Sequence, residues 1–399
     1  MPWAPACFLM NAKLVSLGLL LAGCTSVPQQ PPAKVAQPEP PAPPRAIWAE
    51  QAWPDLAPWQ ASELRPGLQA LGQSCKAMAR KPAWREICSQ WPRLVDADPA
   101  AVRQWLAQHF RLFQMRTSDG TSSGLVTGYY EPLLQGDRQA GKLARYPLYA
   151  VPNDLLTIEL GDVYPELKGM RLRGRLNGRK VQPYPARAQI EAGQAEGLAG
   201  KELAWVTDAV ELFFLQIQGS GRIQLPDGSH LRVGYADQNG HPYKAIGKVL
   251  VEQGMLAPGQ VSMQSIQAWA RANPDKLQAV LDSNPSYVFF RELPASQDGP
   301  PGAQGVPLTA EGSIAVDPRH VPLGTPVWLE TTYPGSARPL RRLVVAQDTG
   351  GAIRGVIRAD FFWGFGPEAG RQAGAMKQAG GMWVLWPREI PLPAEHSQG

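Results

Sequence analysis

The chain has 399 residues, of which 44% are hydrophobic and 18% are charged, and this balance excludes a wholly disordered protein. The 40 glycines and 40 prolines favour a β-rich fold with many turns over long helical bundles. The formal net charge of +5 suits anionic partners, and because no nucleic-acid-binding motif accompanies it, we expect no nucleic acid partner.

A short apolar run near the N-terminus predicts export. Lys13 precedes the run LVSLGLLLAG, which is too short to span a bilayer stably but has the length of a secretory signal core. Cys24 follows a small residue, as the acylated cysteine of a bacterial lipoprotein does. We therefore predict a lipoprotein signal over residues 1–23 and lipidation of Cys24. The alternative is an ordinary signal in which Cys24 is incidental.

The flanks of this signal refine the expected location. The segment before Met10 carries no charge, which favours Met10 over Met1 as the start. Thr25 follows the cysteine, where aspartate would resemble an inner-membrane retention signal, so we expect an outer-membrane lipoprotein facing a Gram-negative periplasm. Residues 24–45 are rich in proline and predict an extended tether with a reach of up to ~60 Å. A peptide-ligand role for this stretch is the weaker alternative.

Two cysteines remain beyond the tether. Cys75 and Cys88 lie in a chain predicted to enter an oxidising compartment, so we expect a disulfide, with two buried free thiols as the alternative. The five histidines show no HExxH spacing, and the chain has neither a P-loop nor a G-x-S-x-G elbow. We therefore expect no metal, no cofactor and no serine nucleophile.

The first half of the folded part predicts both helices and strands. Residues 100–115 carry apolar side chains near helical spacing, which places His109 in a packed helix and not in a catalytic role. Residues 123–136 predict a strand that turns at Glu131 and Pro132. Residues 211–236 predict two β-rich runs joined through PDGS, a hairpin signal.

The second half predicts helices and then short strands. Residues 240–254 predict a helix with Pro242 near its start and Gly254 beyond its end, and residues 262–273 and 274–284 predict two more. Residues 286–293 return to strand. One further helix is expected over residues 366–380. The remaining predicted strands are 313–316, 325–330, 341–348, 355–362 and 382–387.

Eight motifs then point to one family. They are VTGYYEP, FFLQIQGSGR, VGYADQNGHPYKAIGKVL, NPSYVFFRE, GSIAVDPRHVPLGTPVWLET, QDTGGAIRG, DFFWGFGPEAG and MWVLWP. In this order, over roughly residues 100–390, the chain resembles the membrane-bound lytic murein transglycosylase A family. The resemblance implies a mainly β fold with a few helices, in which a double-psi β-barrel catalytic domain is interrupted by an inserted second β-barrel domain. It places the catalytic domain at 46–150 and 286–390, the insertion at 151–285 and a tail at 391–399.

The resemblance also implies a catalytic aspartate. Asp360 corresponds to the single catalytic aspartate of the family, and Asp348 to a second, supporting aspartate. The residues themselves agree, because Phe361, Phe362 and Trp363 follow Asp360 and an apolar setting raises a carboxyl pKa. Without the resemblance, the simpler interpretations prevail, namely a turn cap for Asp348 and a surface strand residue for Asp360; with it, a turn cap remains an equal alternative for Asp348 only. The Gly350–Gly351 pair predicts a tight connection that approaches a ligand.

A groove for a glycan strand is expected beside these aspartates. Tyr235, Asp237 and Trp363 are weaker candidates for contact. The groove candidates are Thr127, Tyr129, Tyr130, Gln218, Gly219 and Ser220.

The implied reaction is cleavage of the β-1,4 bond between N-acetylmuramic acid and N-acetylglucosamine in peptidoglycan, with a 1,6-anhydro end formed in place of hydrolysis. One aspartate suffices because the nucleophile belongs to the substrate. Expected partners are peptidoglycan strands, the outer membrane through the anchor, and murein synthases as an open class. Two alternatives remain: an inverting hydrolase with Asp348 as base and Asp360 as acid, and a non-catalytic wall-binding lipoprotein.

Overall fold

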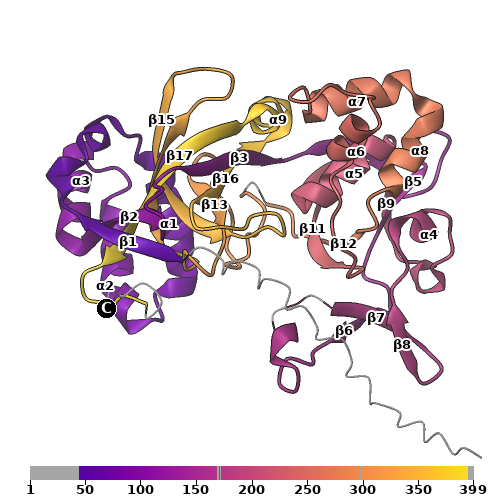
Figure 1. The fold of residues 1–399 in the computed structure, drawn as a ribbon, viewed down its shortest axis with the longest axis horizontal. Coiled ribbons are helices and arrows are strands. Elements are labelled where there is room, and N and C mark those ends of the chain that lie inside the picture. Colours follow the sequence, from indigo (N-terminus) through magenta and orange to yellow (C-terminus); the bar gives the residue numbers. More distant parts are fainter. Residues whose placement is uncertain (1–44, 169, 171, 297, 394–399) are drawn as a thin grey trace, which may run out of the picture. The chain divides into compact units, whose positions relative to one another are not determined.

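The computed structural model describes residues 45–393, except 169, 171 and 297 (Figure 1). The predicted signal, the lipidation site Cys24, residues 24–44 of the tether and residues 394–399 of the tail lie outside the described residues. In the described part, no helix combines the length and the apolar character needed to cross a membrane. The fold is mainly β, with helices at its margins, as expected.

The larger sheet has eight strands in the order β1-β2-β17-β14-β15-β13-β16-β3. Its long last strand pairs with β3 through residues 377–380, with β14 through 381–384 and with β2 through 383–387. Six strands, β17, β14, β15, β13, β16 and β3, therefore form a closed ring. The strands of the sheet are β1 (Ala46–Gln51), β2 (Phe110–Thr117), β3 (Gly124–Glu131), β13 (Ser313–Val316), β14 (Pro326–Thr332), β15 (Pro339–Asp348), β16 (Arg358–Phe365) and β17 (Lys377–Pro387).

Alternation along each strand fills this ring with apolar side chains. On β16, Ala359, Phe361 and Trp363 point into the buried cluster that also contains Ile314 of β13. Successive side chains of a strand face opposite ways, so Asp360 and Phe362 point to the other face of the sheet. The ring thus carries a packed interior and, on its outer face, the residues of the predicted site.

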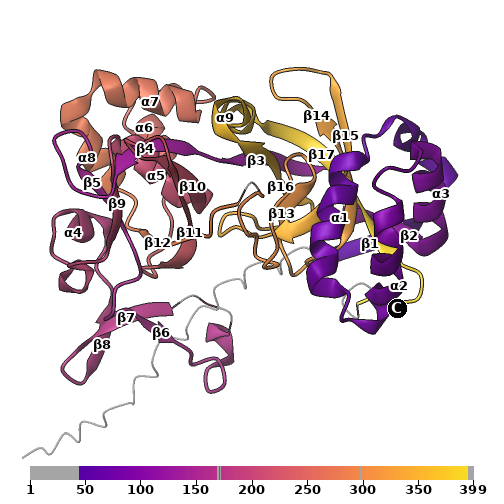
Figure 2. The ribbon, with the colours of Figure 1, turned by 180° about the vertical axis from the view of Figure 1, so that it is seen from behind.

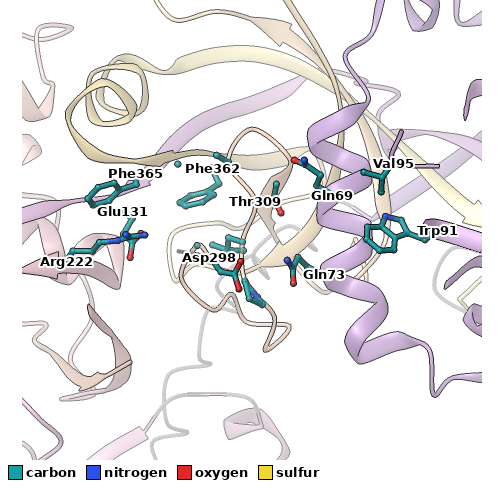
Figure 3. Close-up of a pocket in the computed structure, with 15 residues that line it drawn as sticks. Gln69, Gln73, Trp91, Val95, Glu131, Arg222, Asp298, Thr309, Phe362 and Phe365 are labelled. Carbon is teal, nitrogen blue, oxygen red and sulfur yellow. The ribbon is translucent and has the colours of Figure 1, made fainter. Parts of the chain in front are cut away.

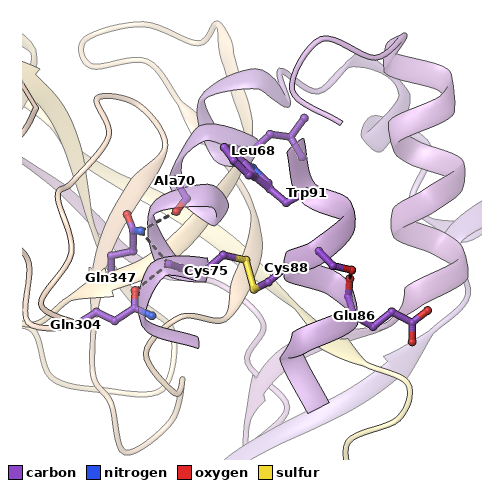
Figure 4. The surroundings of a disulfide bond; sticks show 10 residues. Leu68, Ala70, Cys75, Glu86, Cys88, Trp91, Gln304 and Gln347 are labelled. Atoms are coloured by element: carbon purple, nitrogen blue, oxygen red, sulfur yellow. Dashed lines mark hydrogen bonds between the residues drawn. A yellow bond between two sulfur atoms is a disulfide. The ribbon is translucent and has the colours of Figure 1, made fainter. Parts of the chain in front are cut away.

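Helices cover part of the outer face, and Figure 2 shows α1 beside β15. A Cβ at Gly67 would lie 2.2 Å from the carbonyl oxygen of Leu343, so glycine is required for this close approach of α1 to β15. Cys75 of α1 and Cys88 of α2 form a disulfide with a Cα–Cα distance of 5.3 Å (Figure 4). These helices are α1 (Arg65–Met78), α2 (Pro82–Gln90) and α3 (Pro99–His109).

The chain between β3 and β13 builds two further sheets. A six-stranded sheet has the order β12-β11-β10-β4-β9-β5, and a three-stranded sheet has the order β6-β7-β8. Their strands are β4 (Leu133–Asp137), β5 (Tyr146–Tyr149), β6 (Leu156–Ile158), β7 (Leu172–Asn177), β8 (Lys180–Pro183), β9 (Glu202–Val206), β10 (Ser220–Gln224), β11 (His230–Gln238) and β12 (Val288–Glu292). The remaining helices are α4 (Arg187–Glu191), α5 (Ala209–Gln218), α6 (Ile246–Glu252), α7 (Met263–Ala272), α8 (Pro274–Asp282) and α9 (Gly366–Ala375).

Two predicted elements are wrong in type. Residues 211–218, expected as a strand, form the helix α5. The side chain of Asp208 accepts hydrogen bonds from the amides of Val210 and Glu211 at its start, and Gly219 ends it with a φ of 78°. Residues 110–115, expected to continue a helix, form the strand β2, while His109 is the last residue of α3 and stacks on Trp105 with the ring centroids 4.4 Å apart. Apolar runs of this length fit either element when they are buried on both sides.

Two predicted helices have different bounds. Helix α6 begins at Ile246, so Pro242 precedes it by more than a turn, although Gly254 does lie beyond its end. Helix α9 ends at Ala375, and residues 377–380 belong to β17 because they pair with β3. The predictions for α7, α8 and the hairpin through 226–229 are confirmed.

Candidate active site

Four residues lie in one row across four neighbouring strands. Ala315 of β13 pairs with Asp348 of β15 on one side and with Asp360 of β16 on the other. Asp360 pairs in turn with Thr127 of β3. Neighbouring strands are about 4.8 Å apart, so the two aspartate Cα atoms are separated by roughly 10 Å, with only an alanine side chain between them. A shift of register between Ile314 and Ala315 brings Asp348 into this row.

Asp360 lies on the outer face of the ring in a mostly enclosed position. The hydroxyl of Thr127 donates a hydrogen bond of 2.5 Å to its Oδ1. Burial is the main effect on this carboxyl, and it raises the pKa of Asp360 to about 6, with a further rise from the charge of Asp348. The Thr127 hydrogen bond and the charge of Arg358 act in the opposite direction, by stabilising the ionised form. Near pH 6, Asp360 can therefore both give and take a proton.

Asp348 ends β15 and is held by three donors. Its Oδ1 accepts hydrogen bonds from the amides of Ala303 and Thr349, each at 2.9 Å. Its Oδ2 accepts a hydrogen bond of 3.1 Å from the hydroxyl of Tyr129. Burial raises the pKa of Asp348, while these three donors oppose the rise. The ring of Tyr129 packs on Phe362 with centroids 5.1 Å apart, so one apolar wall borders both aspartates.

A buried amide fixes the backbone next to Asp348. Gln347 is fully buried, and its Nε2 donates to the carbonyl of Ala70 and to the hydroxyl of Ser74, each at 2.8 Å (Figure 4). Its Oε1 accepts from the hydroxyl of Ser313 at 2.5 Å. Ser74 also donates to Gln304, which lies in the same loop as the Asp348 donor Ala303. Helix α1 and the 298–310 loop thereby set the position of the β15 end.

A pocket of about 530 Å³ opens beside Asp348. Helix α5 ends at Gln218, and its left-handed Gly219 turns the chain directly into Ser220 of β10, so these three predicted groove residues follow one another along the wall. The weaker candidate Tyr235 lines the same pocket and is 37% exposed. The facing wall consists of the connection 348–352, including both predicted glycines. A Cβ at Gly351 would meet no other atom within 4 Å, so packing within this chain does not require glycine there.

The other candidates lie elsewhere. Tyr130 points away from the aspartates, towards Gly370 of α9, although its amide donates to Gln218 at 3.1 Å. Trp363 belongs to the interior of the ring, and its Nε1 contacts the sulfur of Met376. Asp237 forms an ion pair of 2.9 Å with Arg173. Within the described residues, no three histidine, cysteine, aspartate or glutamate side chains gather where a metal ion could be held.

The sequence did not reveal the residues that position the two aspartates but take no part in proton transfer. Ala315 and Gln347 lie within two of the family motifs, but neither they nor the Ala303 amide carries a chemical signal in the sequence. Their roles depend on strand register and on a loop that returns from far along the chain. Arg358 could have been found, since it lies two positions before Asp360 on the same strand and so shares its face.

A second pocket, of about 450 Å³, lies along the same strands but is lined by none of the predicted site residues (Figure 3). Glu131 of β3, which is buried, pairs there with Arg222 of β10 at 2.9 Å. The guanidinium of Arg222 lies 4.2 Å from the ring centre of Phe365. Because this pair joins β3 to the six-stranded sheet, it fixes the strand that carries Thr127 and Tyr129.

Comparison with known proteins places this geometry in a family. The model described as the MltA specific insert domain matches residues 125–291, and the 3D domain model matches residues 312–386. Membrane-bound lytic murein transglycosylase A of Vibrio cholerae is 30% identical over 408 residues, covering 98% of this chain and 100% of the relative. The chain belongs to the membrane-bound lytic murein transglycosylase A family.

Solved structures of the family resemble the described fold. MltA from Neisseria gonorrhoeae is 37% identical, with a TM-score of 0.75, and the match covers 87% of this chain and 94% of that one. MltA from Escherichia coli with bound chitohexaose is 27% identical, with a TM-score of 0.66, and the match covers 86% of this chain and 94% of that one.

Proposed function

We propose that the chain cleaves the β-1,4 bond between N-acetylmuramic acid and N-acetylglucosamine in peptidoglycan and leaves a 1,6-anhydromuramic acid end, as an enzyme of cell-wall turnover and remodelling. As a member of its family, the chain is a lytic transglycosylase. The single observation that carries the proposed mechanism is the row of Asp348, Ala315, Asp360 and Thr127, in which one aspartate has a pKa of about 6.

Asp360 is the proposed acid and then the proposed base. In its protonated form it donates to the glycosidic oxygen, and the bond between that oxygen and the muramoyl C1 breaks. The resulting carboxylate takes the proton of the C6 hydroxyl while O6 bonds to C1, so the proton balance closes without water. The Thr127 hydroxyl, which donates to Oδ1, orients the carboxyl and stabilises its ionised stage. Because the nucleophile is already part of the substrate, no activated water is needed.

Asp348 has a supporting role in this proposal. Its three donors hold it in place and favour its ionised form, so it can stabilise the positive charge that develops on the sugar. No cofactor enters either step. The proposed glycan groove passes Gln218, Gly219 and Ser220, whose pocket reaches Asp348. The bound chitohexaose of the Escherichia coli relative supports glycan binding in this fold.

The finer architecture is part of the same proposal. We infer that the closed ring is the double-psi β-barrel of a catalytic domain that lies within 46–150 and 286–390. The inserted β domain, centred on 151–285, also takes in β4, β5 and β12, because these strands pair in the six-stranded sheet. Closure of the ring through the pairing of β17 with β3 supports the first assignment.

Product analysis in H₂¹⁸O tests the reaction. We expect digestion of purified murein to give 1,6-anhydromuropeptides that carry no ¹⁸O, as measured by mass spectrometry. Reducing ends that carry ¹⁸O would overturn the proposal and identify a hydrolase. Binding to murein without any cleavage would also overturn it and identify a wall-binding lipoprotein.

We further propose that Cys24 anchors the protein in the outer membrane with the folded part in the periplasm. The relatives' names describe membrane-bound enzymes, which supports membrane association. Cys24→Ser should release the protein from outer-membrane fractions while murein cleavage in extracts remains. Unchanged fractionation would contradict the anchor and leave the reaction untouched.

A further inference from the structure

The three-stranded sheet β6-β7-β8 has one apolar face. Leu172 pairs with Ile158, and Leu176 pairs with Val181 across the β7–β8 hairpin. Gly174, between the two leucines, pairs with Leu156 on one side and Pro183 on the other. Since directly paired residues share a face, these apolar residues all lie on one side of the sheet.

This face is not covered by the described chain at the hairpin end. Leu176 is 61% exposed and Val181 is 53% exposed. No side chain of the face belongs to any of the buried clusters formed by the described residues. The connection between β6 and β7 adds further large exposed apolar side chains, namely Leu160, Val163, Tyr164 and Met170. Large exposed apolar side chains gathered in one sheet and its connection indicate a binding surface.

The opposite face of the same sheet is polar and basic. Arg175 pairs with Gln182, and Asn177 pairs with Lys180. Residues 156–183, which include the connection between β6 and β7, contain six basic and three acidic residues. Arg173 is neutralised by Asp237, but Arg175, Arg179 and Lys180 form no ion pair with any described residue. The hairpin therefore presents exposed aliphatic side chains on one face, and positive charges that form no ion pair on the other face and in its turn.

We propose that the β6-β7-β8 sheet lies with its apolar face on the surface of an anionic lipid bilayer, so that Leu176 and Val181 reach the acyl chains and Arg179 and Lys180 at the turn reach the phosphate headgroups. Aliphatic side chains gain free energy from hydrocarbon but not from a hydrated glycan, which aromatic rings and hydrogen bonds recognise. A second copy of the chain would bring two basic hairpins together and repel. Charge complementarity therefore favours lipid over glycan or self-association. The inference is independent of the aspartate chemistry.

Vesicle flotation tests this proposal. The protein used is the chain from residue 24 with Cys24→Ser, which retains the compact unit Pro44–Gly399 but has neither the signal segment nor an acyl group. It should float with vesicles of phosphatidylglycerol and phosphatidylethanolamine, and at least about tenfold less with phosphatidylcholine alone. Leu176→Ser with Val181→Ser should lower the partition coefficient about tenfold or more. Arg179→Glu with Lys180→Glu should lower it similarly, and this loss should shrink at high salt.

Leu143→Ser is the matched control, because Leu143 is an apolar residue outside this sheet that is even more exposed, at 79%. It should bind vesicles as the parent does, and all variants should keep the parent melting temperature and the parent rate on soluble glycan fragments. Absence of parent binding to anionic vesicles would overturn the proposal, as would equal binding by the Leu143 and Leu176/Val181 variants. Loss of sacculus binding or of a dimer in the Leu176/Val181 variant, without parent vesicle binding, would reassign the surface to glycan or to a second copy.

Discussion

An aspartate lies at the end of β15 and another in the middle of β16, and the two differ in the number of hydrogen-bond donors around them. Asp348 accepts hydrogen bonds from two amides and a tyrosine, whereas a single hydroxyl donates to Asp360. Burial raises the pKa of both carboxyls, to about 6 for Asp360. We infer that the fold divides roles between two like groups. Three donors hold the Asp348 carboxyl in place and oppose the effect of burial on its pKa, whereas Asp360, with a single donor, can exchange its proton near pH 6.

The largest expected effect comes from Asp360→Asn. The amide keeps the volume of the side chain but has no proton to donate and cannot become a base, so both transfers are lost. General acid–base catalysis is typically worth ~10²–10⁴ in rate, and we expect a loss at or above the top of that range. The measurement is release of 1,6-anhydromuropeptides from purified murein, with a thermal melt to verify folding.

Asp227→Asn is the matched control, because Asp227 is an exposed aspartate in the turn between β10 and β11. It should cleave murein at the parent rate. A well-folded Asp360→Asn protein that is as active as this control would remove Asp360 from the mechanism.

Asp348→Asn should cost less, about 10²-fold, because electrostatic support is lost while the proton transfers remain. The charge of Asp348 helps to raise the pKa of Asp360. The fall of kcat/KM with rising pH should therefore begin at lower pH in this variant. A loss equal to that of Asp360→Asn would contradict the division of roles and favour two proton-transferring carboxylates, as in an inverting hydrolase.

The raised pKa of Asp360 should also affect the pH dependence of the free energy of unfolding. The pKa of Asp360 is about 6 in the folded state against an ordinary 3.8, so between these values the folded state keeps a proton that the unfolded state has lost. The free energy of unfolding should consequently fall as pH rises through this window, by up to ~3 kcal/mol for a shift of about two units. Asp360→Asn removes this contribution to the pH dependence and leaves that of the other groups in place. Urea unfolding should show that the free energy of unfolding of Asp360→Asn, relative to that of the parent, is higher at pH 8 than at pH 4. The same difference at both pH values would count against a raised pKa of Asp360.

The smallest effect is expected from Thr127→Val. The Thr127 hydrogen bond lowers the pKa of Asp360, so its loss should raise that pKa and move the alkaline fall of kcat/KM to higher pH by less than about one unit. Thr127→Ser keeps a hydroxyl and should retain the parent profile. A shift in the same direction for both variants would show that packing, and not the hydrogen bond, sets the effect.

Sequence reasoning recovered the strands of the ring because their residues alternate or run continuously apolar, as in the stretch that contains Phe361. It failed for α5, where an apolar run buried on two sides has no clear period and only the caps Asp208 and Gly219 distinguish helix from strand. The Asp360 assignment required a family motif. Neither the pairing of Ala315 with both aspartates nor the contact of Tyr129 with Asp348 could be predicted, since strand register joins segments some 30 to 220 residues apart.

Direct titration of Asp360 tests the central claim most closely. Aspartate labelled with ¹³C at Cγ gives a carboxyl resonance for each residue, and the one that disappears in Asp360→Asn belongs to Asp360. We predict that this resonance titrates with a midpoint of about 6. A midpoint near the ordinary value of 3.8 would contradict the account, because Asp360 would then carry no proton to donate near neutral pH.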